Sequence, residues 1–123
     1  MVDLVDSISS LICGGNVVIA LINSHYPVLA TLLGEVFATS DFPAGVVNLL
    51  TGGVDELVET ISTHMEIQAI AFDGSVKIDQ AKLKEASVQN LKRIHFNSES
   101  KKKSLEKILN FVEQKTIWHP IGV

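Results

Sequence analysis

Apolar residues along this chain alternate between short continuous runs and helical stripes. The run "GGNVVIALI" follows two glycines and is typical of a buried parallel strand. Pro27 then opens a predicted helix from Tyr26 to about Thr39, and three more strands are predicted at "VVNLL", "IQAIAF" and "KRIHF". A further helix is predicted from about Ser75 to Val88. Three more are predicted from apolar stripes: Leu4, Ile8, Leu11 and Ile12; Val54, Leu57, Val58 and Ile61; and Leu105, Ile108, Leu109 and Val112.

Strands that recur roughly every 25 residues with helices between them indicate successive right-handed βαβ units. The predicted fold class is therefore α/β, Rossmann-like and doubly wound, with a mostly parallel sheet and helices on both faces. Ligands of such sheets bind at the carboxyl ends of the strands, so the informative segments are Leu21 to Ser24, Thr51 to Gly53 and Asp73 to Ser75.

A chain of 123 residues with 46% apolar content is expected to form one domain. Residues 1–97 are predicted as the βα domain, and residues 98–123 as the C-terminal helix and docking tail of the same domain. The tail places Trp118 and Ile121 around Pro120, outside any periodic element. Such a segment is expected to pack as an edge strand or to dock on a neighbouring domain.

The net charge of −4 is distributed unevenly along the chain. Every Lys and Arg lies at Lys77 or later, so the preceding part carries acidic side chains only. That part is a poor surface for a nucleic acid or a free phosphate. The later cluster "SESKKKSLEK" has no interleaved aromatic residues and is predicted to be a solvated helix face, so no nucleic-acid partner is expected.

The only cysteine, Cys13, excludes an intramolecular disulfide and is predicted to be a small buried thiol. No apolar run approaches the roughly 18 residues of a membrane span, and the acidic start does not resemble a signal peptide. We therefore expect no membrane partner and a cytoplasmic location.

Other familiar site patterns are not found in the sequence. The histidines stand without metal-ligand spacing, so no metal site is expected: His25, His64, His95 and His119. Neither a G-x-x-x-x-G-K-[ST] phosphate loop nor a G-x-S-x-G nucleophile turn occurs.

At the strand ends the chain resembles the nucleotide-binding domain of the aldehyde dehydrogenase superfamily. "GNVVIAL…YPVLATLLGEVFATSDFPAGVVNLLTG" has the spacing of that family's first strand, crossover helix, "FPxGVVN" segment and Thr-Gly turn, and "HMEIQAIAFDGS" is similar to its "HP-x-I-x-x-I-x-FTGS" element. The resemblance covers roughly Leu11 to Phe96. The ending "KTIWHPIGV" resembles the C-terminus of the family 16 aldehyde dehydrogenases, whose second dehydrogenase-like region is truncated.

The resemblance implies positions for NAD or NADP, and several of them are altered here. In the family, a Lys and a Glu after the first strand hold the adenosine ribose, but the matching segment is Leu21 to Ser24. In the "F-T-G-S-T-x-x-G" pyrophosphate turn, Asp73 replaces the Thr and Asp79 the final Gly. The residues that still match are Gly52, Gly74 and Ser75, which we interpret as a vestigial cofactor site, and no cofactor is expected for this chain.

Two carboxylates compete with a phosphate for the positive end of a helix. Asp73 is predicted to cap a helix that begins near Ser75. Cys13 matches no nucleophile position of the family, and "NSESKKK" stands where active members carry a Glu-Leu-Gly-Gly-Lys segment. No catalytic residue is therefore predicted.

Two functions remain open at this point. The first is an aldehyde dehydrogenase-like domain or fragment without the catalytic Cys and Glu, a pseudoenzyme that serves as a structural or interaction module for the remainder of a parent dehydrogenase chain or for a protein partner, and that can form oligomers. The alternative is the cofactor-binding portion of an active NAD(P)-dependent aldehyde dehydrogenase, an oxidoreductase that converts aldehydes to carboxylic acids.

Overall fold

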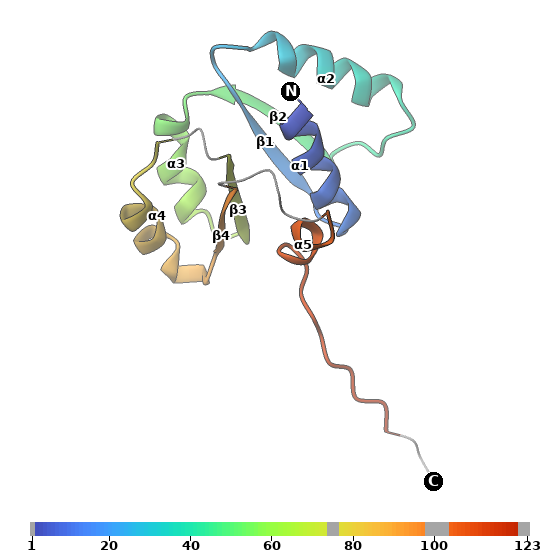
Figure 1. The fold of residues 1–123 in the computed structure, drawn as a ribbon, viewed down its shortest axis with the longest axis vertical. Helices are drawn as coiled ribbons and strands as arrows, with labels where there is room; N and C mark the ends of the chain where they lie inside the picture. Colours follow the sequence, from blue (N-terminus) through green and yellow to red (C-terminus); the bar gives the residue numbers. More distant parts are fainter. Residues whose placement is uncertain (1, 74–76, 98–103, 121–123) are drawn as a thin grey trace.

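A computed structural model of the chain describes residues 2–73, 77–97 and 104–120. Helices and strands alternate along it, as the apolar pattern predicts (Figure 1). The elements in chain order are α1 (Val2–Cys13), β1 (Val18–Asn23), α2 (Val28–Thr39), β2 (Val47–Gly52), α3 (Val54–Thr63), β3 (Ala69–Asp73), α4 (Gln80–Ala86), the short 3-10 turn η1 (Val88–Asn90), β4 (Arg93–Asn97) and α5 (Ser104–Leu109).

The four strands form two parallel pairs. β1 pairs with β2 so that Val18 lies opposite Val47, and β3 pairs with β4 so that Ala69 lies opposite Arg93. Each pair is one βαβ unit, because α2 connects β1 to β2 and α4 with η1 connects β3 to β4. The predicted α/β class and parallel pairing are confirmed, whereas the single doubly wound sheet is not formed among the described residues, which make two separate two-stranded sheets.

The first pair is anchored by α1. Ile8 of α1 packs with Val18 and Ala20 of β1, and these three residues are buried. Burial alternates along β1, since every second side chain faces α1. On the opposite face, Ile19 is 52% exposed. Helices are predicted to cover both faces of the sheet, but at Ile19 the described residues cover only the face toward α1.

The second pair packs with α3 and α4, and a buried lysine closes this unit. Leu83 of α4 and Ile70 of β3 are buried in it. Lys92 is only 7% exposed, and its ammonium group donates hydrogen bonds to the carbonyl of His64 at the end of α3 (2.7 Å) and to that of Ile67 in the loop before β3. The same carbonyls also accept from other groups, His64 from the Ile67 amide at 3.3 Å and Ile67 from the Asn90 side chain at 3.1 Å. Lys92 therefore adds to a local network that joins the end of α3 to the segment before β4.

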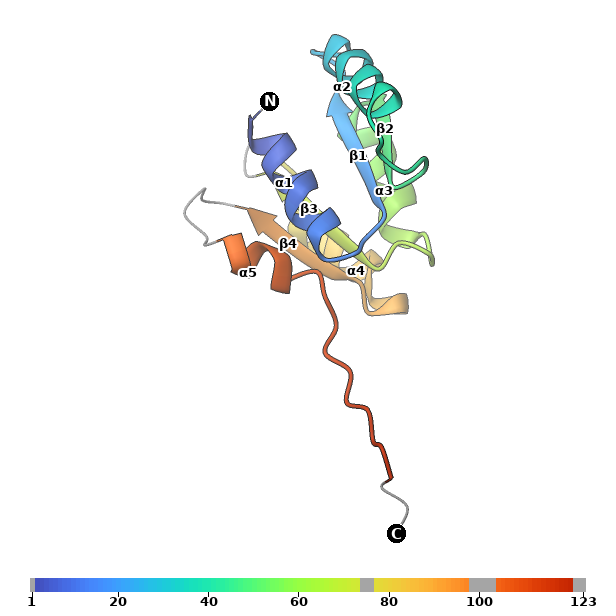
Figure 2. The same ribbon diagram turned by 90° about the vertical axis from the view of Figure 1, so that its right-hand side faces the viewer.

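The end of the chain leaves the body of the molecule. α5 lies beside α1, and Lys107 of α5 forms an ion pair with Asp6 of α1. From residue 112 to residue 120 the chain has no regular structure, and both ribbon views show it projecting away from the strands (Figures 1 and 2). Within the described ranges, no helix has the length and apolar character needed to cross a bilayer.

Candidate functional site

The carboxyl ends of β1 and β2 lie together. The parallel register places Ile22 opposite Thr51 and Asn23 opposite Gly52. The segments Leu21 to Ser24 and Thr51 to Gly53, which the sequence singles out separately, therefore meet at one edge, as expected for parallel strands. β3 ends at Asp73, while Gly74 and Ser75 lie outside the described residues.

The end of β1 is occupied by a local turn. The Asn23 side-chain oxygen accepts a hydrogen bond from the backbone N–H of His25 at 3.0 Å, and the Asn23 carbonyl accepts one from Tyr26 at 3.0 Å. Ile22 is buried, whereas Asn23 and Ser24 are exposed. Leu21 and Ser24 stand where the resemblance implies the ribose-holding Lys and Glu, so this end of β1 offers a half-buried aliphatic side chain and a short hydroxyl in place of an ammonium and a carboxylate.

The glycine at the end of β2 has a packing reason. A Cβ atom on Gly52 would come within 3.2 Å of Leu57 Cδ1, so any larger residue would push against α3. The first turn of α3 also carries two acids, Asp55 and Glu56. Gly52 is therefore explained by the close approach of strand and helix, and the neighbouring carboxylates oppose an anion at this helix end.

The start of α4 differs from the prediction. The helix begins at Gln80 with Asp79 as its N-cap, and residues 77–79 before it are not helical. Ser75 and the side chain of Asp73, on which the predicted start and cap depend, lie outside the described part of the chain. One carboxylate oxygen of Asp79 accepts hydrogen bonds from the backbone N–H groups of Ala81 (3.0 Å) and Lys82 (3.3 Å). An acidic residue is a strong cap because it satisfies amide donors that have no partner inside the helix, and this preference places the start after Asp79.

These contacts can be compared with the groups that the resemblance implies for a dinucleotide. In the family, a pyrophosphate uses free amides at the helix that follows the third strand. Here two amides of α4 are not available to another acceptor because Asp79 binds them, the described end of β1 carries no charged side chain, and Asp55 and Glu56 lie in the first turn of α3. Among the described residues, no side chain matches the family's ribose contacts, and Gly74 and Ser75 of the phosphate turn lie outside them.

The structure also changes the interpretation of Cys13. Its side chain is exposed, so the prediction of a buried thiol is wrong. Cys13 is the last residue of α1, and the chain reverses at Gly14 and Gly15 before β1 begins. The thiol therefore lies toward the amino end of β1, at the edge opposite to the strand ends, where no base of the candidate site reaches it.

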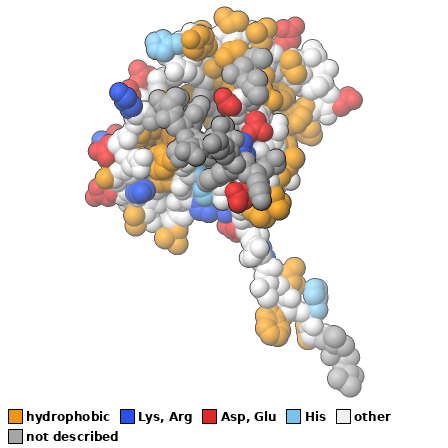
Figure 3. Space-filling model, in the orientation of Figure 1, with side chains coloured by type: hydrophobic (Ala, Val, Ile, Leu, Met, Phe, Trp, Pro, Cys, Tyr) orange, Lys and Arg blue, Asp and Glu red, His pale blue; other side chains and the backbone are white. Residues whose placement is uncertain are grey.

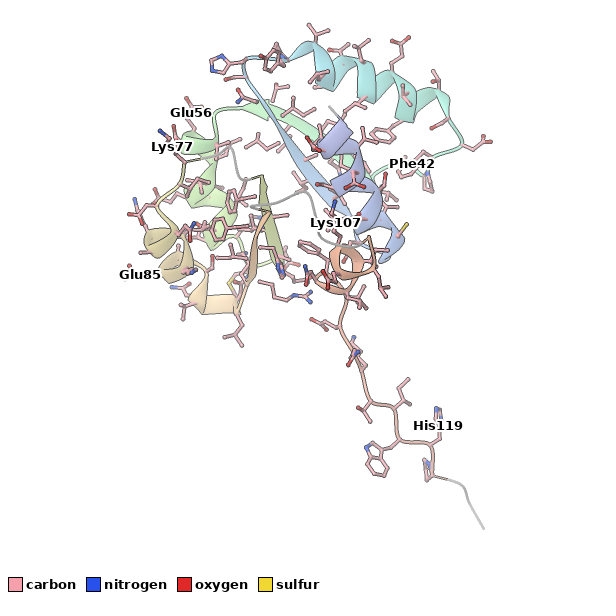
Figure 4. The ribbon with its side chains drawn as sticks, in the orientation of Figure 1. Phe42, Glu56, Lys77, Glu85, Lys107 and His119 are labelled. Carbon is pink, nitrogen blue, oxygen red and sulfur yellow. The ribbon has the colours of Figure 1, made fainter. Side chains whose placement is uncertain are left out.

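The histidines lie apart from one another. His25 is in the turn after β1, His64 caps the end of α3 and accepts from the Glu66 amide at 3.3 Å, His95 packs on Phe111 with ring centroids 4.8 Å apart, and His119 is in the tail (Figure 4). The described ranges contain no group of three metal-ligating side chains.

A groove beside β2 was not predicted. It has a volume of about 720 Å³ and runs between α2 and β2. Every residue from 47 to 51 lines it, opposite Pro27, Ala30, Thr31, Gly34 and Phe37. The sequence of α2 contains a signal for this groove. Its apolar residues are not confined to the stripe formed by Leu29, Leu32, Leu33 and Val36, so some of them are left uncovered by the rest of the described chain.

Comparison with known proteins gives a consistent result. A profile described as "Aldehyde dehydrogenase family" matches residues 2–105. Human "Retinaldehyde dehydrogenase 3" is 34% identical over 91 residues, which are 74% of this chain and 18% of that protein. "Aldehyde dehydrogenase, cytosolic 1" from Elephantulus edwardii is 32% identical over 94 residues (76% and 19%), and "NADP/NAD-dependent aldehyde dehydrogenase PuuC" from Escherichia coli is 35% identical over 83 residues (68% and 17%).

This chain thus spans about a fifth of the length of these relatives. No solved structure matches it. The profile covers most of the chain, and two of the segments that carry the resemblance lie side by side at the paired ends of β1 and β2. The chain belongs to the aldehyde dehydrogenase family.

Proposed function

We propose that this chain is a non-catalytic aldehyde dehydrogenase-family module, whose role is to bind the remainder of a parent dehydrogenase chain or another protein. The observation that carries the proposal is the capping of α4 by Asp79. Its carboxylate holds the amides of Ala81 and Lys82, at the position where the family's phosphate turn has glycine. A carboxylate cap and a phosphate cannot occupy the same donors.

The other strand ends support the same function. Leu21 and Ser24 stand where the family holds the ribose with Lys and Glu. The exposed Cys13 ends α1, before β1, so it lies toward the opposite edge from these positions and matches no nucleophile position of the family. Altered residues at the strand ends of a retained α/β fold support the role of a pseudoenzyme module.

The proposal includes three finer points. The tail resemblance favours the C-terminal region of family 16 aldehyde dehydrogenases as the parent context. In that context we expect the two strand pairs to join one doubly wound sheet, with the uncovered face of β1 buried. A cytoplasmic location is expected, since a relative carries the name "Aldehyde dehydrogenase, cytosolic 1".

One observation favours the alternative function. The Escherichia coli relative is named an NADP/NAD-dependent aldehyde dehydrogenase, and it is 35% identical over 83 residues of this chain. Under the alternative, this chain is the cofactor-binding portion of an active enzyme, and Gly52, Gly74 and Ser75 contact NAD or NADP.

A thermal melt against NAD⁺ and NADP⁺ up to millimolar concentration tests the proposal. The unchanged chain, the Asp73→Thr/Asp79→Gly double variant and the Asp41→Thr control are each compared with their own ligand-free midpoints. A ligand at 100 times its dissociation constant adds about 2.7 kcal/mol to the free energy of unfolding, which raises the midpoint by several degrees in a domain of this size.

We expect no shift for the unchanged chain or for Asp41→Thr, because the acids remain at the strand ends. A shift in the unchanged chain would overturn the proposal and establish the alternative. A shift in the double variant alone would show that the two acids close an otherwise competent site.

A further inference from the structure

The free edge of β2 offers a place for another strand. β2 pairs with β1 alone among the described strands, and the groove described above follows its other side. Side chains of a strand alternate between its two faces, yet five consecutive residues, 47 to 51, line this groove. A groove that is lined by consecutive residues, and so by side chains of both faces, must run along the edge of the strand.

The backbone groups at that edge follow from the ladder. The Val18 amide donates to the Val46 carbonyl, and Val18 lies opposite Val47. In a parallel ladder with this register, Asn48 and Leu50 direct their N–H and C=O groups toward β1. The groups of Val47, Leu49 and Thr51 therefore point away from β1, into the groove.

Apolar side chains border this edge on both faces of the sheet. On one face, Leu49 lies toward α2, where the groove is lined by Ala30 and Phe37. On the other face, Leu50 is 44% exposed and Ile19 is 52% exposed. A segment that pairs with β2 would meet apolar surface above and below the sheet.

The tail of the chain has the matching features. Residues 115–120 are extended, and Figure 3 shows hydrophobic side chains along the tail where it stands clear of the body. Ile117 is 72% exposed and Trp118 is 89% exposed. Neighbouring side chains of a strand point to opposite faces, so Ile117 and Trp118 can cover one apolar face each.

Length and charge also agree. β2 has six residues, and the tail from Lys115 to Pro120 has the same number, so both span about 20 Å when extended. Lys115 is the only Asp, Glu, Lys or Arg from residue 114 to residue 120. Residues 27–51, which supply the groove, contain Glu35 and Asp41 and no Lys or Arg. Attraction between Lys115 and these acidic side chains favours the tail over an acidic segment as the partner of the groove.

We propose that the tail of one copy of this chain pairs with the β2 edge of a second copy, and that the exchange is reciprocal, so that a closed dimer forms. The mode is strand addition, in which backbone hydrogen bonds supply affinity and the alternate side chains supply specificity. The inference rests on the proposed role as an interaction module and names its partner as a second copy.

The chain carries its own probe for the test. Trp118 is the only tryptophan, so the fluorescence emission of the full chain reports the surroundings of the tail alone. We expect the emission to shift to the blue as the protein concentration rises, in step with a change from monomer to dimer mass in sedimentation equilibrium.

Thr31→Arg tests the groove without removing a packed side chain, since Thr31 is exposed and lines it. The bulk and positive charge oppose Lys115, and we expect the dimer dissociation constant to rise by about tenfold or more, which corresponds to about 1.4 kcal/mol. Thr60→Arg, on the exposed face of α3 and outside the groove, is the matched control and should behave like the unchanged chain. In the tail, Ile117→Gln should also weaken the dimer, whereas Met65→Gln, at another exposed apolar residue, should not.

Four results would overturn the inference: a monomer with exposed-tryptophan emission at every concentration, a blue shift independent of concentration, a dimer without a blue shift, or equal dimerisation of Thr31→Arg and Thr60→Arg. The second result would place the tail on its own chain. The cofactor melt is read separately, so a monomer that ignores NAD⁺ would end this inference and leave the proposed function standing.

Discussion

Asp79 and Lys92 each satisfy backbone groups at one end of a helix. Asp79 accepts from two amides at the start of α4, and Lys92 donates to the carbonyl of His64 at the end of α3 and to that of Ile67 in the following loop. Asn90 adds donors to the carbonyls of Met65 (3.2 Å) and Ile67 (3.1 Å). The second βαβ unit is thus held at its helix ends by polar side chains from neighbouring segments of the chain.

Substitutions of Asp79 should show whether its contribution to the free energy of unfolding comes from capping α4 or from its charge. Asp79→Ala removes the acceptor for both amides and should lower the free energy of unfolding by about 1 kcal/mol, as lost caps do. Asp79→Ser keeps an acceptor and should recover most of the loss, which urea unfolding of the three proteins measures. Equal stability of Asp79→Ala and the unchanged chain would contradict the capping role.

Lys92→Met should destabilise the chain by about 1–3 kcal/mol, since the His64 and Ile67 carbonyls lose a donor. The control Lys82→Met, on the exposed face of α4, should cost much less. Urea midpoints of both variants provide the comparison, and similar losses in the two would rule out a special role for Lys92.

Lys92 also makes stability depend on pH. Burial lowers the pKa of its ammonium group below the ordinary value of 10.5, because the charged form is desolvated. The folded state then binds fewer protons than the unfolded state, so the Lys92 contribution is complete above pH 10.5 and is lost as pH falls through the folded pKa. The unfolding free energy of the unchanged chain, relative to Lys92→Met, should therefore rise as the pH approaches 10.5 from below, and a flat difference would argue against it.

At the scale of elements, the apolar pattern predicts which segments form helices and strands better than it predicts where a helix begins or which strands pair. The predicted helix from Tyr26 to Thr39 is found as Val28–Thr39, because its apolar spacing and Pro27 specify it locally. The helix predicted from Ser75 instead begins at Gln80, since the capping strength of Asp79 outweighs the family spacing. Strand pairing and the exposure of Cys13 depend on contacts distant in sequence, which periodicity does not contain.

Two contacts of α1 should differ greatly in strength. Ile8 is buried against β1, so Ile8→Ala should cost about 2–5 kcal/mol. The ion pair of Asp6 with Lys107 of α5 is partly exposed, and Lys107→Met should cost at most about 1 kcal/mol. Urea unfolding of both variants is the measurement, and a larger loss in Lys107→Met would mean that the two helices depend on charge rather than on packing.

At the scale of the whole molecule, few apolar side chains are fully removed from water. The described core contains seven buried hydrophobic residues, and large apolar side chains such as Leu32, Val36 and Trp118 are exposed. A domain with so much uncovered apolar surface has low stability by itself and gains stability from association.

The thermal midpoint should therefore rise with protein concentration, since a dimer adds binding free energy to the folded state. Calorimetry at low and high micromolar concentration measures this, and Ile117→Gln should reduce the dependence. A midpoint that is independent of concentration in the unchanged chain would mean that the monomer is the stable unit.

The exposed Cys13 gives the molecule a single natural attachment point. It is the only thiol, and Trp118 is the only indole, at the other end of the chain. A dye on Cys13 that absorbs indole emission would turn the pair into a ruler for energy transfer, without any substitution. Mixing labelled and unlabelled copies would then distinguish transfer within one chain from transfer between two chains.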